Sequence, residues 1–520
     1  MKIILFLVIL LQSLYFSFSK DDILVFLYTH FRHGARAPLD INDTFYDVLG
    51  EKWTNPGELT GIGQRMHYLL GLRNRKKYIT EEKFLSESFN PHEILIHSSN
   101  FNRTMISVSS QLQGFYPQNS DIGEILTEEQ EKMACPPVNI NYPEITEKIE
   151  GLNKAALPYR MTLAPVRMIN DNDRKINVYD IEECKKGRDQ IRKKNTANIS
   201  IIFRNYNDNF NKKYAQSFNK YFGEVNKTYY GSALNGIYDA FTSNYWDSRK
   251  MENLYDKTNL NFTELYYDCL EFFRFLYLEI FHGDKEKTLA HIDSSKLMRE
   301  LIYYMKRRLD SNITEEDEDA NYKDYSYPRM LMISGHDATV TADLIFMINA
   351  LGLDEEKIYT FPKYASQLAL EVRTNKTITK SSTYKDYYVI GYFDDNKIFE
   401  VNADDFINKI EGYIWSDEKI NEFCGFDKTN NTINNTINNT INNTINNNIF
   451  KNNDDEDKSD NAKTAYKVLM IIFICLSAIF LLSTIFLGYK LSKINKMHPP
   501  INQNVSIDQS NITAINLKNK

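Results

Sequence analysis

Three short apolar runs, far apart in the chain, each end directly in a cluster of polar residues. They are residues 23–28, 94–96 and 330–333. Uninterrupted apolar runs are typical of strands buried in a parallel sheet, and open α/β sheets bind ligands beyond the carboxyl ends of such strands. After the third run, residues 338–351 have helical apolar spacing, and the glycine that follows can end a helix. The sequence therefore predicts an α/β fold with a doubly wound, mostly parallel sheet and helices on both faces.

The polar clusters after these runs contain residue types that suit a phosphate group. They hold three arginines, two histidines and one carboxyl group: Arg32, Arg36, Arg103, His33, His336 and Asp337. A guanidinium can bind two phosphate oxygens at once. Surrounding positive charge also favours a neutral imidazole, which is its nucleophilic form. The sequence therefore predicts a pocket for a dianionic phosphoryl group, and this chemistry requires no cofactor.

Composition and charge exclude several classes of protein. Hydrophobic residues make up 42% of the chain and charged residues 25%, which is unlike a mainly disordered protein or a multi-span transporter. The net charge of −7 argues against a nucleic-acid partner, because nucleic-acid binders usually carry a basic surplus. No Cys/His cluster has the spacing of a zinc site, so no metal site is predicted.

Residues 32–38 (RHGARAP) match the pattern RHGxRxP. In this segment the chain resembles the histidine acid phosphatases, the two-domain branch of the histidine phosphatase superfamily. Residues 57–63, 98–107 and 361–366 resemble further segments of that family. The plan of the whole chain is similar to that of lysosomal and membrane-bound prostatic-type acid phosphatases. The resemblance implies a phosphoric monoester hydrolase, with a smaller, mainly α-helical insertion domain beside the α/β domain.

The resemblance also implies a role for each residue of the predicted pocket. His33 would attack phosphorus and carry the phosphoryl group as phosphohistidine. Four residues would bind the phosphoryl oxygens: Arg32, Arg36, Arg103 and His336. Asp337 would protonate the departing alcohol and then deprotonate the attacking water. Because a carboxyl group must be protonated for the first step, acidic working conditions are expected.

Four cysteines, Cys135, Cys184, Cys269 and Cys424, lie in the predicted folded part and permit three pairings. By resemblance, Cys184 and Cys424 correspond to one disulfide of the family. Cys135 and Cys269 are then the pair that remains.

Both ends of the chain lie outside the predicted folded core. Residues 1–19 have the positive, apolar and small-residue regions of a secretory signal. Residues 468–488 form an uncharged apolar run of the length of one transmembrane helix. With a translocated N-terminal part, the chain is expected to be a single-pass type I membrane protein of the lysosome or the cell surface, with a cytosolic tail over residues 489–520.

Between these ends, an α/β phosphatase domain is expected in two parts, over residues 20–134 and 326–427. The mainly helical insertion domain would take residues 135–325. Residues 428–467 form a stalk that contains four copies of the tetrad NNTI and an acidic run. Such a segment cannot bury enough apolar surface to offset the entropy of ordering it. Each tetrad is an Asn-x-Thr acceptor, so glycosylation of the stalk is expected.

Several alternatives stay open at the level of sequence. The expected substrate is a small phosphomonoester, but an inositol-polyphosphate phosphatase (phytase-like) or a phosphomutase of the same superfamily would use the same residues. A catalytically inactive surface glycoprotein, in which the stalk is the functional part, belongs to a different class. Formation of a homodimer is also open.

Overall fold

The computed structural model describes residues 22–39, 53, 55–118, 125–134, 136, 142–169, 184, 232–246, 261–282, 288–310, 328–379 and 381–425, and scattered residues between 201 and 214. All of them fall in one compact unit that ends at Phe426. The predicted signal, stalk, apolar run and tail lie outside the described residues. Within the described ranges, no helix combines the length and apolarity that a membrane crossing needs.

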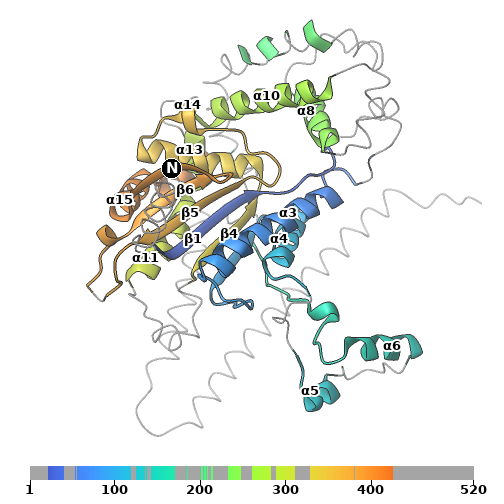
Figure 1. The fold of residues 1–520 in the computed structure, drawn as a ribbon. Coiled ribbons are helices and arrows are strands. Elements are labelled where there is room, and N and C mark those ends of the chain that lie inside the picture. The colour runs from blue at the N-terminus through green and yellow to red at the C-terminus, as the bar shows by residue number, and fades with distance from the viewer. Residues whose placement is uncertain are drawn as a thin grey trace, which may run out of the picture. The chain divides into compact units, whose positions relative to one another are not determined.

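A seven-stranded sheet forms the centre of the fold (Figure 1). Its strands are β1 (Ile23–Arg32), β2 (Ile94–Ser98), β3 (Arg167–Met168), β4 (Met330–Gly335), β5 (Gln367–Thr374), β6 (Tyr388–Phe393) and β7 (Asn396–Asn402). The described helices are α3 (Gly61–Arg75), α4 (Asn102–Phe115), α5 (Glu128–Met133), α6 (Pro143–Leu152), α8 (Ser232–Tyr245), α10 (Phe262–His282), α11 (Thr288–Asp310), α13 (Asp337–Leu351), α14 (Glu355–Ile358), α15 (Ala403–Tyr413) and α16 (Asp417–Cys424). A π-helical turn (Lys76–Glu81) continues α3, and two 3₁₀ turns span Pro158–Arg160 and Tyr384–Asp386.

The strand order is β3-β2-β4-β1-β5-β6-β7. The first four strands of this order pair in parallel, while β5, β6 and β7 join by antiparallel pairing. Five of the strands, β1 to β4 and β6, therefore run in one direction, which agrees with the expected mostly parallel sheet. The antiparallel side was not foreseen. For β6 and β7 it follows from the turn at Asp394 and Asp395, both with positive φ, because a two-residue turn can join only antiparallel strands.

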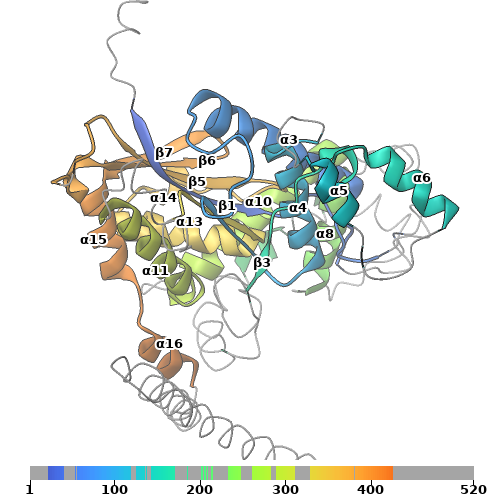
Figure 2. The ribbon, with the colours of Figure 1, turned by 90° about the horizontal axis from the view of Figure 1, so that it is seen from below.

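Helices cover both faces of the sheet, as the sequence predicted (Figures 1 and 2). Successive residues of a strand point to opposite faces. Leu27 and Met332 point to one face and pack into a core with Val108 and Leu112 of α4. Tyr28 and Leu331 point to the other face, where the core is built with α10, α11, α13 and α15. The pattern explains why the strands read as unbroken apolar runs: each face of the sheet is covered.

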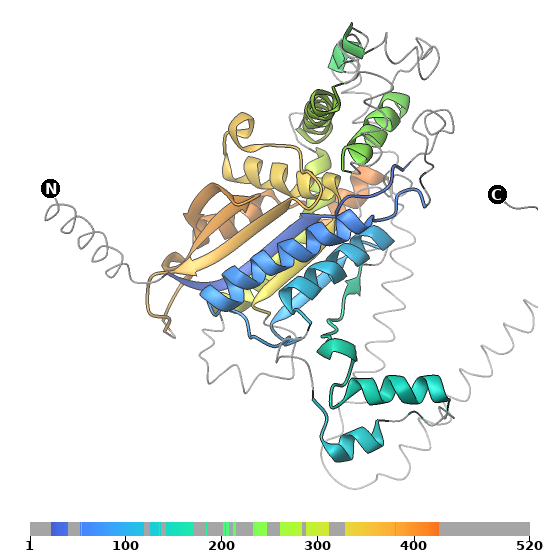
Figure 3. The same cartoon turned by 45° about the vertical axis from the view of Figure 1, so that its right-hand side comes forward.

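Helices α3 and α4 lie side by side on the first of these faces (Figure 3). Glycines allow their backbones to approach closely. A Cβ atom on Gly71 would lie 2.0 Å from the carbonyl oxygen of Gln111, and one on Gly114 would lie 2.0 Å from that of Tyr68. Two non-bonded heavy atoms cannot lie so close together, so the helix crossing depends on glycine at both positions.

Helix α11 falls inside the predicted insertion, residues 135–325, but it packs on the sheet. Its residues Leu301 and Met305 are fully buried in the same core as β1 and β4. Arg308 on this helix donates a hydrogen bond from Nε to the carbonyl oxygen of Val25 in β1, over 3.4 Å. The division of the chain into two domains stays a prediction, with α11 on the sheet side.

A disulfide joins Cys184 to Cys424, 240 residues apart in the chain. Cys269 is different: it is fully buried on α10 and is a free thiol. The expected Cys135–Cys269 bond is therefore wrong for the structure, in which Cys135 lies outside the described residues. Cys269 packs within the apolar core beside Leu265 and Phe272, and its burial raises the pKa of the thiol well above the usual value.

Candidate active site

The three parallel strands β1, β2 and β4 bring the predicted residues to one edge of the sheet. In register, Arg32 lies opposite Gly335, and Ser98 lies opposite Ser334. The next residue of each chain segment continues the pairing: the amide of His33 donates to Gly335 O over 3.0 Å, and that of Ser99 to Ser334 O over 3.1 Å. The segments that follow all three strands therefore meet at their carboxyl ends, as expected for ligand sites of open α/β sheets.

The loop after β1 is held in place by the start of α3. The hydroxyl and the amide of Thr60 both donate to the carbonyl oxygen of Ala35 over 2.9 Å, and the same hydroxyl accepts from Gly63 N as the cap of α3. A Cβ atom on Gly34 would lie 2.4 Å from Gly63 O, so the loop and the helix touch through glycine. Residues 57–63, which were noted only for their resemblance, thus support the loop that carries His33.

His33 has a defined tautomer. Its Nδ1 lies 2.9 Å from the carbonyl oxygen of Gly34. A carbonyl oxygen can only accept, so Nδ1 carries the proton and the lone pair is on Nε2. The ring is 2% exposed. Burial lowers the pKa of His33 well below its usual value, and the positive charges nearby, led by Arg32, lower it further. His33 is therefore a neutral imidazole with one free nucleophilic nitrogen.

Arg32, Arg36 and Arg103 surround this imidazole. Their Nε atoms are all buried, and none has a hydrogen-bond partner among the described residues. The guanidinium of Arg103 lies 4.5 Å from the centre of the Phe101 ring. Burial and the charge of Arg36 together lower the pKa of Arg103 to about 10. Three guanidiniums so close to one another, each with a free buried donor, form a site for an anion.

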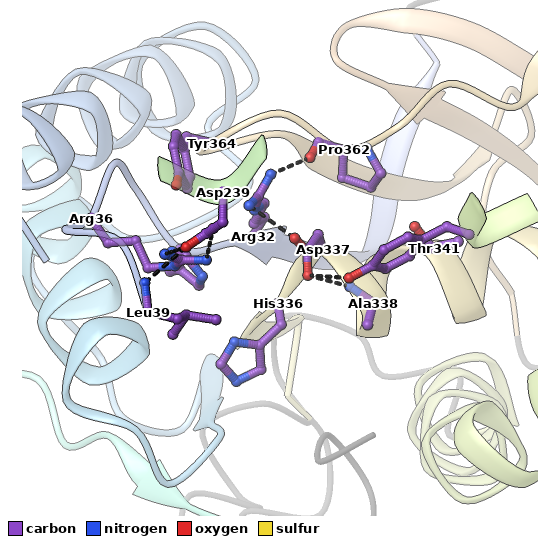
Figure 4. Close-up of polar contacts among 12 residues, drawn as sticks. Arg32, Arg36, Leu39, Asp239, His336, Asp337, Ala338, Thr341, Pro362 and Tyr364 are labelled. Atoms are coloured by element: carbon purple, nitrogen blue, oxygen red, sulfur yellow. Dashed lines mark hydrogen bonds and ion pairs between the residues drawn. The ribbon is translucent and has the colours of Figure 1, made fainter. Parts of the chain in front are cut away.

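Arg32 and Arg36 each also have an acidic partner (Figure 4). Arg32 donates from Nη1 to Pro362 O over 2.7 Å, and its Nη2 lies 2.9 Å from the carboxylate of Asp337. Arg36 forms two hydrogen bonds with the carboxylate of Asp239, of 2.6 and 3.1 Å. Burial opposes the charge of Arg36, but Asp239 outweighs this and raises the pKa of Arg36 above its usual value.

His336 and Asp337 start helix α13 at the end of β4. His336 is the cap residue, its amide donates to Thr339 Oγ1 over 2.8 Å, and its Nε2 lies 3.0 Å from Ser99 Oγ. Burial, followed by the charge of Arg103, lowers the pKa of His336 well below the usual value. Asp337 accepts from Ala338 N over 2.8 Å. The amino end of a fifteen-residue helix adds partial positive charge where these two side chains lie.

All six predicted residues are thus brought to one place, and two contacts were missed. Asp239 of α8 binds Arg36, and the hydroxyl of Tyr277 of α10 lies 3.4 Å from Asp337 Oδ1. Neither residue stands in a recognisable motif, and both come from helices far away in sequence, so no local signal could have found them. Tyr364, which lies in the segment noted for resemblance, stacks 4.3 Å from the guanidinium of Arg32. Across the described part of the chain, no group of His, Cys, Asp and Glu has the arrangement of a metal site.

Comparisons with known proteins found similar chains among curated proteins and solved structures. Lysosomal acid phosphatase of Xenopus laevis is 39% identical over 89 residues, which are 17% of this chain and 19% of that protein. Prostatic acid phosphatase of Homo sapiens is 38% identical over 89 residues, 17% of this chain and 22% of that protein. The chain thus matches about a fifth of the length of these curated relatives. Among solved structures, the phytase from Citrobacter braakii is 14% identical with a TM-score of 0.49, over 77% of this chain and 99% of that chain.

A match to a model of a protein family extends over most of the fold. The sequence model of the histidine phosphatase superfamily (branch 2) matches residues 24–390, from the start of β1 into β6. This range includes all three strands that end at the site and every residue of the predicted pocket. The chain therefore belongs to branch 2 of the histidine phosphatase superfamily.

Proposed function

We propose that the protein is an acid phosphatase that hydrolyses phosphate monoesters through a phosphohistidine on His33. The observation that carries the proposal is the neutral His33 ring, with Nε2 free, among three guanidiniums whose Nε donors have no partner within the described residues. A neutral imidazole is a nucleophile, and the guanidiniums attract the dianionic group that it attacks. Family membership and the named relatives support the same chemistry.

The reaction would take place in two steps. In the first, His33 Nε2 forms a bond to phosphorus while the bond from phosphorus to the ester oxygen breaks, and Asp337 gives its proton to that oxygen. In the second, water attacks phosphorus, its proton returns to Asp337, and the bond from phosphorus to Nε2 breaks. Inorganic phosphate leaves, and His33 and Asp337 return to their starting states.

Each positive group would have a part in lowering the barrier. The negative charge on the phosphoryl oxygens spreads in the transition state, and donors fixed in a buried site stabilise it more than water does. Arg32, Arg36 and Arg103 would supply these donors, with His336 beside them. The contact of Arg32 Nη2 with Asp337 Oδ2, at 2.9 Å, would hold this carboxyl group next to the phosphoryl group. Because the first step needs a carboxylic acid as proton donor, acidic working conditions are expected.

The proposal extends to the location of the protein. Residues 1–19 and 468–488 would translocate and anchor the chain, so that the phosphatase lies in the lumen or outside the cell. The stalk over residues 428–467 would separate the enzyme from the bilayer and carry glycans. The name of one relative, a lysosomal acid phosphatase, supports the secretory pathway.

Phosphohistidine trapping on residues 20–427 tests the proposal. The wild-type protein, mixed with an aryl phosphate labelled with ³²P near pH 5 and quenched in base, should retain label that is stable to base and lost in acid. His33→Ala should retain none and should show no turnover above background. The proposal would be contradicted if the wild-type protein retained no label and turned over no phosphomonoester. Faster turnover of phytate than of simple monoesters would instead assign a phytase-like preference.

A further inference from the structure

Asp239 lies outside the three segments that carry the predicted chemistry, yet its carboxylate makes three contacts with one of them. Its Oδ1 accepts from Arg36 Nη2 over 2.6 Å, and its Oδ2 accepts from Arg36 Nη1 over 3.1 Å. Oδ2 also accepts from the backbone amide of Leu39 over 2.8 Å. Figure 4 shows the carboxylate facing the guanidinium and this amide together. A side chain from α8 thus fixes both the arginine and the loop that carries it.

We propose that Asp239 is a positioning residue that orients Arg36 for binding the phosphoryl group. The inference rests on the proposed phosphatase function. Asp239 would act through Arg36, by holding one edge of the guanidinium so that the other edge faces the substrate.

The geometry of the guanidinium supports this assignment. Its five N–H groups lie in one plane and form two edges that can each bind an oxyanion in bidentate fashion. Asp239 takes the edge formed by Nη1 and Nη2, and Nη1 also donates to Ala37 O over 2.9 Å. The other edge contains Nε, which is buried without a partner among the described residues. A buried donor without a partner is costly, so this edge is suited to a ligand oxygen.

The carboxylate of Asp239 would also offset electrostatic repulsion within the site. Arg36 and Arg103 are close enough that the charge of Arg36 lowers the pKa of Arg103. Without a nearby anion, two such guanidiniums repel each other, and the empty pocket would tend to open. Asp239 offsets this repulsion from the far edge of Arg36, where it does not occupy the place of the phosphate. The cationic site is thereby assembled before the substrate arrives, which removes the cost of ordering it later.

Two other roles would predict different behaviour. If Asp239 only joined α8 to the loop through the amide of Leu39, its loss would lower stability and would affect activity equally whether or not Arg36 was present. If Asp239 only competed with phosphate for Arg36, its loss would strengthen phosphate binding. Orientation of Arg36 predicts the opposite: weaker phosphate binding, and no effect of Asp239 once Arg36 is gone.

A double-mutant cycle distinguishes these roles. Values of kcat/KM for an aryl phosphate would be measured for the wild type, Asp239→Asn, Arg36→Ala and the double variant. Asp239→Asn should lower kcat/KM by about 10- to 100-fold in the wild-type background, and by less than about 2-fold in the Arg36→Ala background. Equal losses in both backgrounds, no loss in either, or a gain in kcat/KM would overturn the proposal.

Asp417→Asn is the matched control. It removes another Asp–Arg pair, that of Arg299 Nη2 with Asp417 Oδ1 at 2.9 Å. This pair joins α11 to α16, and neither helix carries a residue of the site. Its kcat/KM should equal that of the wild type. If Asp239→Asn does not fold, Asp239→Glu can replace it, because glutamate keeps the negative charge but shifts its position. Asp239→Glu should lower kcat/KM by less than Asp239→Asn, and this loss should likewise vanish in the Arg36→Ala background.

Binding of inorganic phosphate by calorimetry separates this inference from the proposed function. If the wild type hydrolyses the ester and Asp239→Asn binds phosphate as tightly as the wild type, the role of Asp239 is wrong and the phosphatase stands. If the wild type binds phosphate but does not turn over, the proposed function is wrong, and weaker phosphate binding by Asp239→Asn still supports the positioning role.

Discussion

At the scale of single residues, the buried His67 makes the stability of the fold depend on pH. His67 lies on α3, its ring centre is 5.2 Å from that of Phe31 in β1, and its Nδ1 is 3.1 Å from Gln111 Oε1. Burial lowers the pKa of His67 to about 4, although hydrogen bonds to Gln111 and to the backbone of Arg32 partly offset it. In the unfolded chain the same imidazole titrates near 6.5. Below that pH, the unfolded state therefore binds a proton that the folded state excludes.

The sign of this linkage predicts a loss of stability in acid. Since the unfolded state binds more protons, the free energy of unfolding falls as pH drops from about 6.5 towards about 4. Between pH 7 and pH 4.5, His67 should account for about 2 kcal/mol of this fall. His67→Gln, which does not titrate, should lose that much less than the wild type over the same interval. Urea unfolding at both pH values measures the difference, and equal losses for the two proteins would refute the prediction.

At the scale of elements, local sequence decided what could be predicted. Residues 23–28 and 330–333 are unbroken apolar runs because both faces of the sheet are covered, which makes them recognisable as buried strands. The polar residues that follow these runs in the sequence therefore had to lie at the carboxyl edge of the sheet. The pairing of Arg36 with Asp239 spans 203 residues and leaves no periodic trace. The antiparallel side of the sheet escaped prediction for a related reason: the turn at Asp394 and Asp395 defines a hairpin only through its backbone angles.

The contact between α3 and the loop that carries His33 offers an element-scale prediction. A Cβ atom on Gly63 would lie 2.2 Å from Ala35 O and 2.8 Å from Ala35 N, so Gly63→Ala must push the loop away from the helix. We expect Gly63→Ala to lower kcat/KM by about 100-fold and the free energy of unfolding by about 1–3 kcal/mol. Steady-state kinetics and urea unfolding measure both effects.

Gly61→Ala is the control from the same turn of α3. Among the described residues, no atom outside its own helix and chain neighbours lies within 4 Å of a Cβ built there, so activity should be unchanged. Stability should be equal or slightly higher, because alanine favours helix more than glycine does. If both alanine variants keep full activity, the loop does not depend on its close contact with α3.

At the scale of the whole molecule, the disulfide ties two distant parts of the chain together. Cys184 belongs to the predicted insertion, residues 135–325, and Cys424 ends α16, where the last described residues of the fold lie. Both cysteines are buried. The bond therefore fixes the point at which the chain leaves the fold towards the proposed stalk. It is also a source of stability that acid does not remove, in contrast to His67.

Loss of this bond should lower stability measurably. A cross-link that closes a loop of 240 residues removes many conformations from the unfolded chain, and removing such a native disulfide typically costs about 2–5 kcal/mol. For a fold of roughly 400 residues this corresponds to a decrease of about 2–6 °C in Tm. The double variant Cys184→Ser/Cys424→Ser should show that decrease. Dithiothreitol should lower the Tm of the wild type by a similar amount and leave the double variant unchanged, because Cys269 is already a free thiol. A reductant effect of equal size on both proteins would mean that another bond, outside the described residues, provides the stabilisation.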